Sequence, residues 1–193
     1  MMGRLFRSRS GAAALALATG LILCSDAPAA DVGQKAPEFK APALDGRSKL
    51  ALSAYRGKVV YLDFWASWCP PCLTSIPQLE EMRKQFPSDQ FQILAVNVDQ
   101  DPQKARKFLE RNRIGYPTAT DPRGTIPASF GIETMPTSFL IDRDGVIRYV
   151  HHGFRKGDIE PLRERIAQLI AASAPRAAPA PARKPAPPAA RKK

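Results

Sequence analysis

The sequence predicts an α/β domain in which helices flank a central parallel or mixed β-sheet, and three observations support this. Residues 59–62 (Val-Val-Tyr-Leu) form a β-branched and aromatic run that is typical of a buried strand. Residues 73–86 carry apolar side chains three or four positions apart, which predicts one buried helix face. Residues 91–98 form a second apolar strand. Strand, helix and strand in this order predict a βαβ unit with a right-handed crossover.

Two cysteines, Cys69 and Cys72, lie at the junction between the first strand and the first helix. Pro70 and Pro71 separate them and suit a first helical turn, where an N–H group would have no partner in the helix. Cys69 is therefore expected at the helix N-terminus, whose free N–H groups and dipole stabilise a thiolate. Because the thiolate is the nucleophile in disulfide exchange, we predict a lowered pKa and a nucleophilic role for Cys69. Cys72, one turn inward, would be the resolving thiol.

Half of a zinc site is the alternative interpretation of this cysteine pair. Structural zinc needs four ligands, and the chain offers only Cys24, His151 and His152 besides the pair. The two histidines are neighbours at the end of an expected strand, where successive side chains point to opposite faces. We therefore expect no metal and no cofactor.

The stretch around the cysteines resembles the active-site segment of the thioredoxin superfamily. More narrowly, it resembles the TlpA/ResA-like thiol-disulfide oxidoreductases of the bacterial envelope, over residues 33–170. A lone Cys-X-X-Cys is a weak signal, but an ordered set of segments is specific. The matching segments are residues 36–39 (APEF), 57–60 (GKVV), 64–69 (FWASWC), Pro77 and 135–142 (MPTSFLID). The resemblance implies a thioredoxin-like fold with a redox-active Cys69–Cys72 disulfide.

The resemblance also implies three substrate-binding residues. Pro136 matches the proline that is cis in this family and faces the cysteine pair. Met135, just before it, matches the residue that pairs with the substrate backbone, with a core-filling role as the alternative. Trp68 would be an exposed apolar platform beside the cysteines, whereas Trp65 is expected in the core.

Asp63 interrupts the otherwise apolar first strand, and a buried unpaired carboxylate is costly. It lies six residues before Cys69, as does the buried acid of thioredoxin, so the resemblance implies proton transfer; a hydrogen-bonded structural role is the alternative. Ser75 stands where ResA-like proteins often carry an acid, and Ala95 stands where thioredoxin has a lysine. With no amine nearby, burial is expected to raise the pKa of Asp63.

The remaining elements are predicted from turn and capping signals. The basic face of the second helix is expected to be solvated. The expected elements are a hairpin within residues 31–57, a helical turn near residues 53–55, a helix capped by Asp101, a short strand and a short helix within residues 114–135, a hairpin of residues 137–142 and 146–151, and a final helix after Gly157-Asp158.

Residues 1–30 are interpreted as a cleaved signal peptide. Arg4, Arg7 and Arg9 precede thirteen apolar residues, which are few for a membrane span, and small residues follow at 27–29. Lipid attachment at Cys24 is the alternative, although the residue before a lipidated cysteine is normally small. The mature protein would then be periplasmic and would begin near residue 30 or 31.

The net charge of +11 belongs mostly to the chain ends, because residues 1–30 contribute +2 and residues 174–193 contribute +6. The predicted thioredoxin-like domain, residues 31–173, keeps only +3, so nothing indicates nucleic-acid binding. Residues 174–193 contain six Pro, eight Ala and six basic residues, and we predict a disordered tail. Such a tail could touch anionic envelope components, although an inert role is favoured.

The function expected from these observations is that of a periplasmic thiol-disulfide oxidoreductase that reduces protein disulfides, in cytochrome c maturation or a related pathway. Its partners would be protein thiols and disulfides and an envelope electron donor, and it would act as a monomer. A disulfide-forming oxidase, a peroxiredoxin-like enzyme and a copper carrier remain as alternatives. Neither cysteine follows the Pro-x-x-x-Thr/Ser-x-x-Cys pattern of peroxiredoxins.

Overall fold

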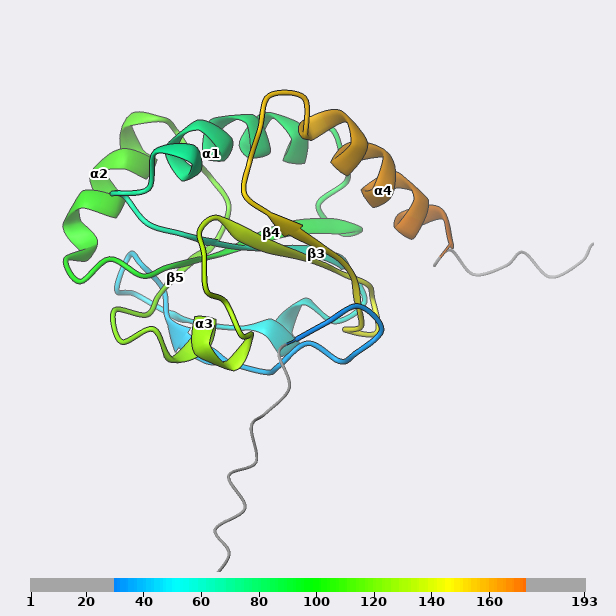
Figure 1. Cartoon of the computed structure of the whole chain (residues 1–193), viewed down its shortest axis with the longest axis horizontal. Coiled ribbons are helices and arrows are strands. Elements are labelled where there is room, and N and C mark those ends of the chain that lie inside the picture. Colours follow the sequence, from blue (N-terminus) through cyan, green and yellow to red (C-terminus); the bar gives the residue numbers. More distant parts are fainter. Residues whose placement is uncertain (1–29, 173–193) are drawn as a thin grey trace, which may run out of the picture.

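The computed structural model describes residues 30–172 as one α/β domain (Figure 1). The predicted tail and all of the predicted signal peptide except residue 30 lie outside the described residues. The strands are β1 (Lys40–Pro42), β2 (Lys49–Ala51), β3 (Val59–Trp65), β4 (Phe91–Asn97), β5 (Thr118–Thr120), β6 (Thr137–Ile141) and β7 (Ile147–His152). The helices are α1 (Pro70–Arg83), α2 (Pro102–Arg111), α3 (Thr125–Ser129) and α4 (Ile159–Ala172), with a 3₁₀ turn η1 at Leu52–Tyr55.

The central sheet is mixed, with the strand order β5-β4-β3-β6-β7. Strands β3, β4 and β5 run parallel, whereas β6 pairs antiparallel with both β3 and β7. Every residue of the middle strand β3 is buried, as its apolar sequence predicts. The separate hairpin β1–β2 confirms the predicted N-terminal extension.

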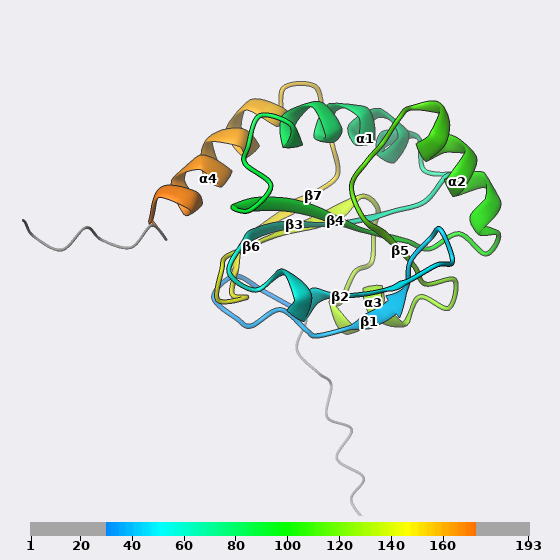
Figure 2. The ribbon, with the colours of Figure 1, turned by 180° about the vertical axis from the view of Figure 1, so that it is seen from behind.

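Two layers cover the sheet: α1, α2 and α4 lie on one face, while the β1–β2 hairpin, η1 and α3 lie on the other (Figures 1 and 2). Successive residues of β3 point to opposite faces of the sheet, so alternate side chains pack into the hydrophobic core on each face. Tyr61 and Trp65 belong to the cluster under the three long helices, which also contains Cys69 and Cys72. Asp63 has the same parity and therefore lies on the helix-covered face.

The smaller elements also match the sequence prediction. The side chain of Asp101 caps α2 by accepting a hydrogen bond from the Gln103 N–H at 3.0 Å. Residues 114–135 form one short strand, β5, and one short helix, α3. Helix α1 continues through Pro77.

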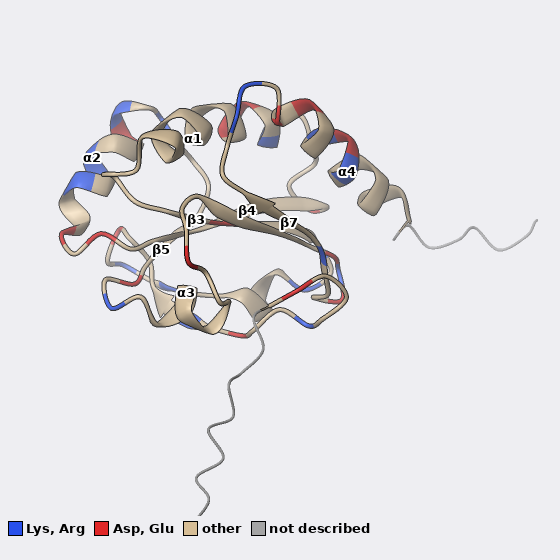
Figure 3. Ribbon diagram, viewed as in Figure 1, with Lys and Arg blue, Asp and Glu red and all other residues tan. Residues whose placement is uncertain are grey.

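The charges lie mostly on the outer surfaces of helices and on loops (Figure 3). Lys104, Lys107 and Arg111 of α2 are exposed, in agreement with the predicted solvated face. Arg106 differs, because it is half-buried and its Nε donates a hydrogen bond to the Leu44 carbonyl. This contact joins α2 to the β1–β2 turn. No helix within residues 30–172 combines the length and the apolar composition of a membrane span.

Candidate redox site

Cys69 and Cys72 form a disulfide at the N-terminus of α1, with an S–S distance of 2.03 Å and a Cα–Cα distance of 5.3 Å. Cys69 is the N-cap residue in an extended conformation, and its Sγ accepts a hydrogen bond from the Cys72 N–H at 3.3 Å. Pro70 and Pro71 occupy the first helical turn, as predicted. Because Cys69 is 4% exposed and Cys72 is fully buried, Cys69 is the sulfur nearer to solvent.

Two features that the resemblance implies are present, a cis peptide bond before Pro136 and an exposed Trp68. The Met135–Pro136 peptide bond is cis, and Met135 packs against the cluster that holds both cysteines. Trp68 is 67% exposed, an unusual exposure for a large aromatic side chain. Trp65 is fully buried and its ring lies 5.9 Å from that of Phe108, which confirms its place in the core.

Asp63 is the acidic group buried in the middle of the sheet. Its Oδ1 accepts a hydrogen bond from the Ser138 hydroxyl at 2.7 Å, while its Oδ2 has no hydrogen-bond partner among the described residues. Burial raises the pKa of Asp63 to about 7, and the hydrogen bond from Ser138 opposes that rise. The predicted increase in pKa is therefore confirmed, and the carboxyl titrates near neutral pH.

The strand register explains why no positively charged side chain lies opposite Asp63 on the two neighbouring strands. Asp63 pairs with Ala95 on β4 and with Ser138 on β6, so a methyl group and a hydroxyl flank the carboxyl. Ala95, which stands where thioredoxin has a lysine, is thus beside Asp63, as predicted. Ser75, at the place of the missing acid, is buried and donates to the Cys72 carbonyl at 3.0 Å.

The structure brings further polar residues to this site that sequence reasoning did not select. The Tyr61 hydroxyl lies 3.0 Å from Nδ1 of His151, and Nε2 of His151 lies 3.1 Å from the Asp158 carboxylate. His151 is buried and His152 is exposed, in agreement with their opposite orientation on a strand. The available signal was the polar tip of Tyr61 and the hydroxyl of Ser138, each within a buried and mostly apolar strand.

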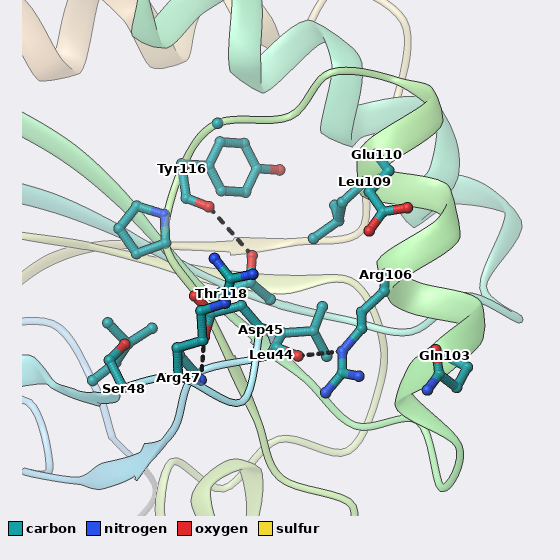
Figure 4. Close-up of a pocket in the computed structure, with 14 residues that line it drawn as sticks. Leu44, Asp45, Arg47, Ser48, Gln103, Arg106, Leu109, Glu110, Tyr116 and Thr118 are labelled. Carbon is teal, nitrogen blue, oxygen red and sulfur yellow. Dashed lines mark hydrogen bonds between the residues drawn. The ribbon is translucent and has the colours of Figure 1, made fainter.

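A pocket of about 710 Å³ lies between α2, the β1–β2 turn and the segment before β5 (Figure 4). Leu44, Arg106 and Tyr116 contribute to its wall, but neither cysteine does. The cysteine pair is thus separate from this pocket. Within residues 30–172, no three His, Cys, Asp or Glu side chains gather as ligands for a metal ion.

The comparisons with known proteins place the chain in one family. Residues 31–166 match the Redoxin family model. The thiol-disulfide oxidoreductase ResA of Geobacillus thermodenitrificans is 36% identical over 136 residues, which cover 70% of this chain and 78% of the relative. The thioredoxin-like protein YneN of Bacillus subtilis is 34% identical over 124 residues, or 63% of this chain and 71% of the relative.

Solved structures agree with this assignment. A Chlorobium tepidum protein described as the thiol:disulfide interchange protein DsbE has 43% identity and a TM-score of 0.69, and the match covers 74% of this chain and 99% of that one. StoA of Bacillus subtilis has 30% identity and a TM-score of 0.57, with 67% and 96% covered. The chain therefore belongs to the Redoxin family within the thioredoxin superfamily, and it is a thiol-disulfide oxidoreductase of the ResA type.

Proposed function

We propose that the protein is a periplasmic reductase of protein disulfides, acting through Cys69 and Cys72 in cytochrome c maturation or a related thiol-reduction pathway. The observation that carries the proposal is the disulfide at the N-terminus of α1, on the same side of the sheet as the buried Asp63. The signal-like residues 1–30 and the resemblance to envelope oxidoreductases support the location. An envelope electron donor would reduce the enzyme again.

In the first step the Cys69 thiolate attacks one sulfur of a substrate disulfide. The substrate S–S bond breaks, a mixed disulfide with Cys69 forms, and the first substrate thiolate takes up a proton from solvent. The Cys72 N–H, which donates to the Cys69 Sγ, and the dipole of α1 favour the thiolate form of Cys69.

In the second step the Cys72 thiol gives its proton to the Asp63 carboxylate and attacks the Cys69 sulfur. The mixed disulfide breaks, the second substrate thiolate leaves and is protonated by solvent, and the Cys69–Cys72 disulfide forms. Two electrons have then passed from the enzyme to the substrate. A carboxyl with a pKa of about 7 is suited to this exchange, because it can both accept and release a proton near neutral pH.

Trp68 and Met135 would provide the surface on which a protein substrate docks. Trp68 offers an exposed apolar face directly before Cys69, and Met135 precedes the cis-proline Pro136. An extended substrate segment could pair with the backbone at Met135, as a strand added to a sheet edge does.

Two cysteine variants test the order of the steps. Cys69→Ser should abolish reduction of insulin, because no mixed disulfide can form. Cys72→Ser should leave covalent adducts with substrate that survive on non-reducing gels, since the resolving thiol is missing. Adducts that form in Cys69→Ser instead would reverse the assignment.

The direction of electron flow is tested by the reduction potential of the cysteine pair against glutathione. A reductase should have a potential near that of thioredoxin, about −270 mV. A potential near that of DsbA, about −120 mV, would make the protein a disulfide-forming oxidase instead.

A further inference from the structure

A continuous series of polar groups connects Asp63 with the loop before α4. The Ser138 hydroxyl donates to Oδ1 of Asp63 at 2.7 Å. Ser138 pairs with His151 in the β6–β7 register, and its side chain lowers the pKa of Tyr61, so it lies beside the Tyr61 hydroxyl. The Tyr61 hydroxyl lies 3.0 Å from Nδ1 of His151, whose Nε2 lies 3.1 Å from Oδ2 of Asp158. The series crosses from β3 to β6 and β7 and ends just outside the sheet.

Burial decreases along this series from its inner to its outer end. Asp63, Tyr61 and Ser138 are all at most 2% exposed, whereas His151 reaches 9%. The Asp158 side chain is 29% exposed and therefore contacts solvent. On the side of the cysteines, Cys69 is 4% exposed and Cys72 is fully buried.

Each intermediate group in the series can accept a proton on one side and donate one on the other. Serine and tyrosine hydroxyls each have one donor and acceptor lone pairs, and imidazole has one nitrogen for each function. Asp158 is held in place because its Oδ2 also accepts a hydrogen bond from the Arg155 N–H at 2.7 Å. An ordered outer carboxylate fixes the direction in which Nε2 of His151 points.

We propose that four side chains form a proton relay between the Asp63 carboxyl and solvent: Ser138, Tyr61, His151 and Asp158. The inference rests on the proposed function for the reason that Asp63 must gain and lose a proton in each cycle. It goes beyond that function by naming the route that the proton takes.

The inward transfer begins with a His151 imidazolium that has taken a proton from solvent through Asp158. Its Nδ1 proton moves to the Tyr61 oxygen, the Tyr61 proton moves to Ser138, and the Ser138 proton moves to Oδ1 of Asp63. Each hydroxyl keeps one proton, imidazole becomes neutral, and the carboxylate becomes a carboxylic acid. Outward transfer is the reverse.

The other titratable groups around the relay lie outside this path. The ring of Tyr149 on β7 stacks on His151 at 6.0 Å, and the Arg165 guanidinium of α4 lies 4.3 Å from the Tyr149 ring. On the opposite side of Asp63, the Tyr116 hydroxyl is buried without a hydrogen-bond partner among the described residues, and Glu80 of α1 acts electrostatically on it. Tyr116 offers the one rival route that these contacts indicate.

The test measures protonation of Asp63 in the oxidised protein, without substrate or turnover. Light-triggered acid release would shift the solution from about pH 8.5 to about pH 6, which brackets the pKa of about 7. The infrared carbonyl band of the protonated carboxyl, identified by its loss in Asp63→Asn, would report the rate. We expect Tyr61→Phe, which keeps the ring and removes the hydroxyl, to slow this rate at least about tenfold.

Tyr149→Phe is the matched control, because it removes a neighbouring hydroxyl outside the relay and should keep the wild-type rate. Asp158→Asn alters the outer, partly exposed end and should also slow protonation; it decides the question should Tyr61→Phe fail to fold. A wild-type protonation rate in Tyr61→Phe would overturn the relay and favour a proton route past Tyr116. If only Asp158→Asn folds, a wild-type rate in that variant would do the same. Since no turnover is measured, an inactive enzyme with a Tyr61-dependent rate would contradict the proposed function alone.

Discussion

At the scale of single residues, Asp63 imposes a free-energy cost on the fold that depends on pH. Its folded pKa of about 7 lies above the value of about 3.9 expected in the unfolded chain. Between these values the folded state binds more protons than the unfolded state, so stability falls as pH rises. The cost is absent below about pH 4 and is complete above about pH 7. At 1.36 kcal/mol per pKa unit, its upper limit is on the order of 4 kcal/mol.

Asp63→Asn should therefore stabilise the protein near pH 7 by roughly 1–3 kcal/mol, because the new amide group loses part of the gain by being buried without a full set of partners. The gain should fade as pH falls to about 4. Urea unfolding at several pH values, with the disulfide intact in both proteins, measures it.

The same variant should release the mixed disulfide about 10²-fold more slowly, because Asn cannot accept the Cys72 proton. Stopped-flow kinetics of mixed-disulfide release measure this second effect. A variant that loses stability at pH 7 and resolves adducts at the normal rate would make Asp63 a structural residue.

At the scale of elements, the β6–β7 turn contains Asp142, a carboxylate whose pKa is lowered, whereas the pKa of Asp63 is raised. Burial disfavours the Asp142 carboxylate, but hydrogen bonds from the Val146 N–H at 2.9 Å and from Arg148 at 2.6 Å hold its pKa below the usual value. Gly145, with a φ of +80°, completes the turn that the Asp-Gly pair predicted. Such a depressed pKa contributes stability above the unfolded pKa, and this contribution is lost as pH falls through the folded pKa.

Asp142→Asn should destabilise the protein by about 1–2 kcal/mol at pH 7, because the charge-assisted bond to Arg148 is lost. As pH falls from about 4 through the lower folded pKa of Asp142, the difference from wild type should shrink, since the wild-type carboxyl becomes protonated over that range. The same urea series measures this variant, and its pH dependence should be opposite in sign to that of Asp63→Asn. A constant difference at all pH values would show that the turn depends on geometry alone.

At the scale of the whole molecule, most of the net positive charge belongs to segments outside residues 31–173. We predict that export removes residues 1–29 or 1–30, so that the mature protein lacks Cys24. Intact-mass measurement of protein recovered from the envelope checks this. A lipid-modified Cys24 at the new N-terminus would show that the protein is a lipoprotein and would anchor it to a membrane.

The elements and the cysteine site could be predicted because their signals are local in the sequence. Apolar periodicity specifies a strand or a helix, an Asp-Gly pair specifies a turn, and Pro70 with Pro71 specifies a helix start. The mixed sheet, the two hairpins and the buried Trp65 follow from such patterns together with the family resemblance. The raised pKa of Asp63 also followed, since one carboxyl in an apolar strand is a local anomaly.

By itself, the sequence determined the fold class, the place of the Cys69–Cys72 pair at a helix N-terminus and the burial of Asp63. Only the tertiary structure decided which groups meet that carboxyl. Ser138 is 75 positions from Asp63 and His151 is 90 positions from Tyr61, and they meet because β6 and β7 pair in one register beside β3. A shift of one residue in that register would turn Ser138 to the opposite face of the sheet, and no local pattern specifies it.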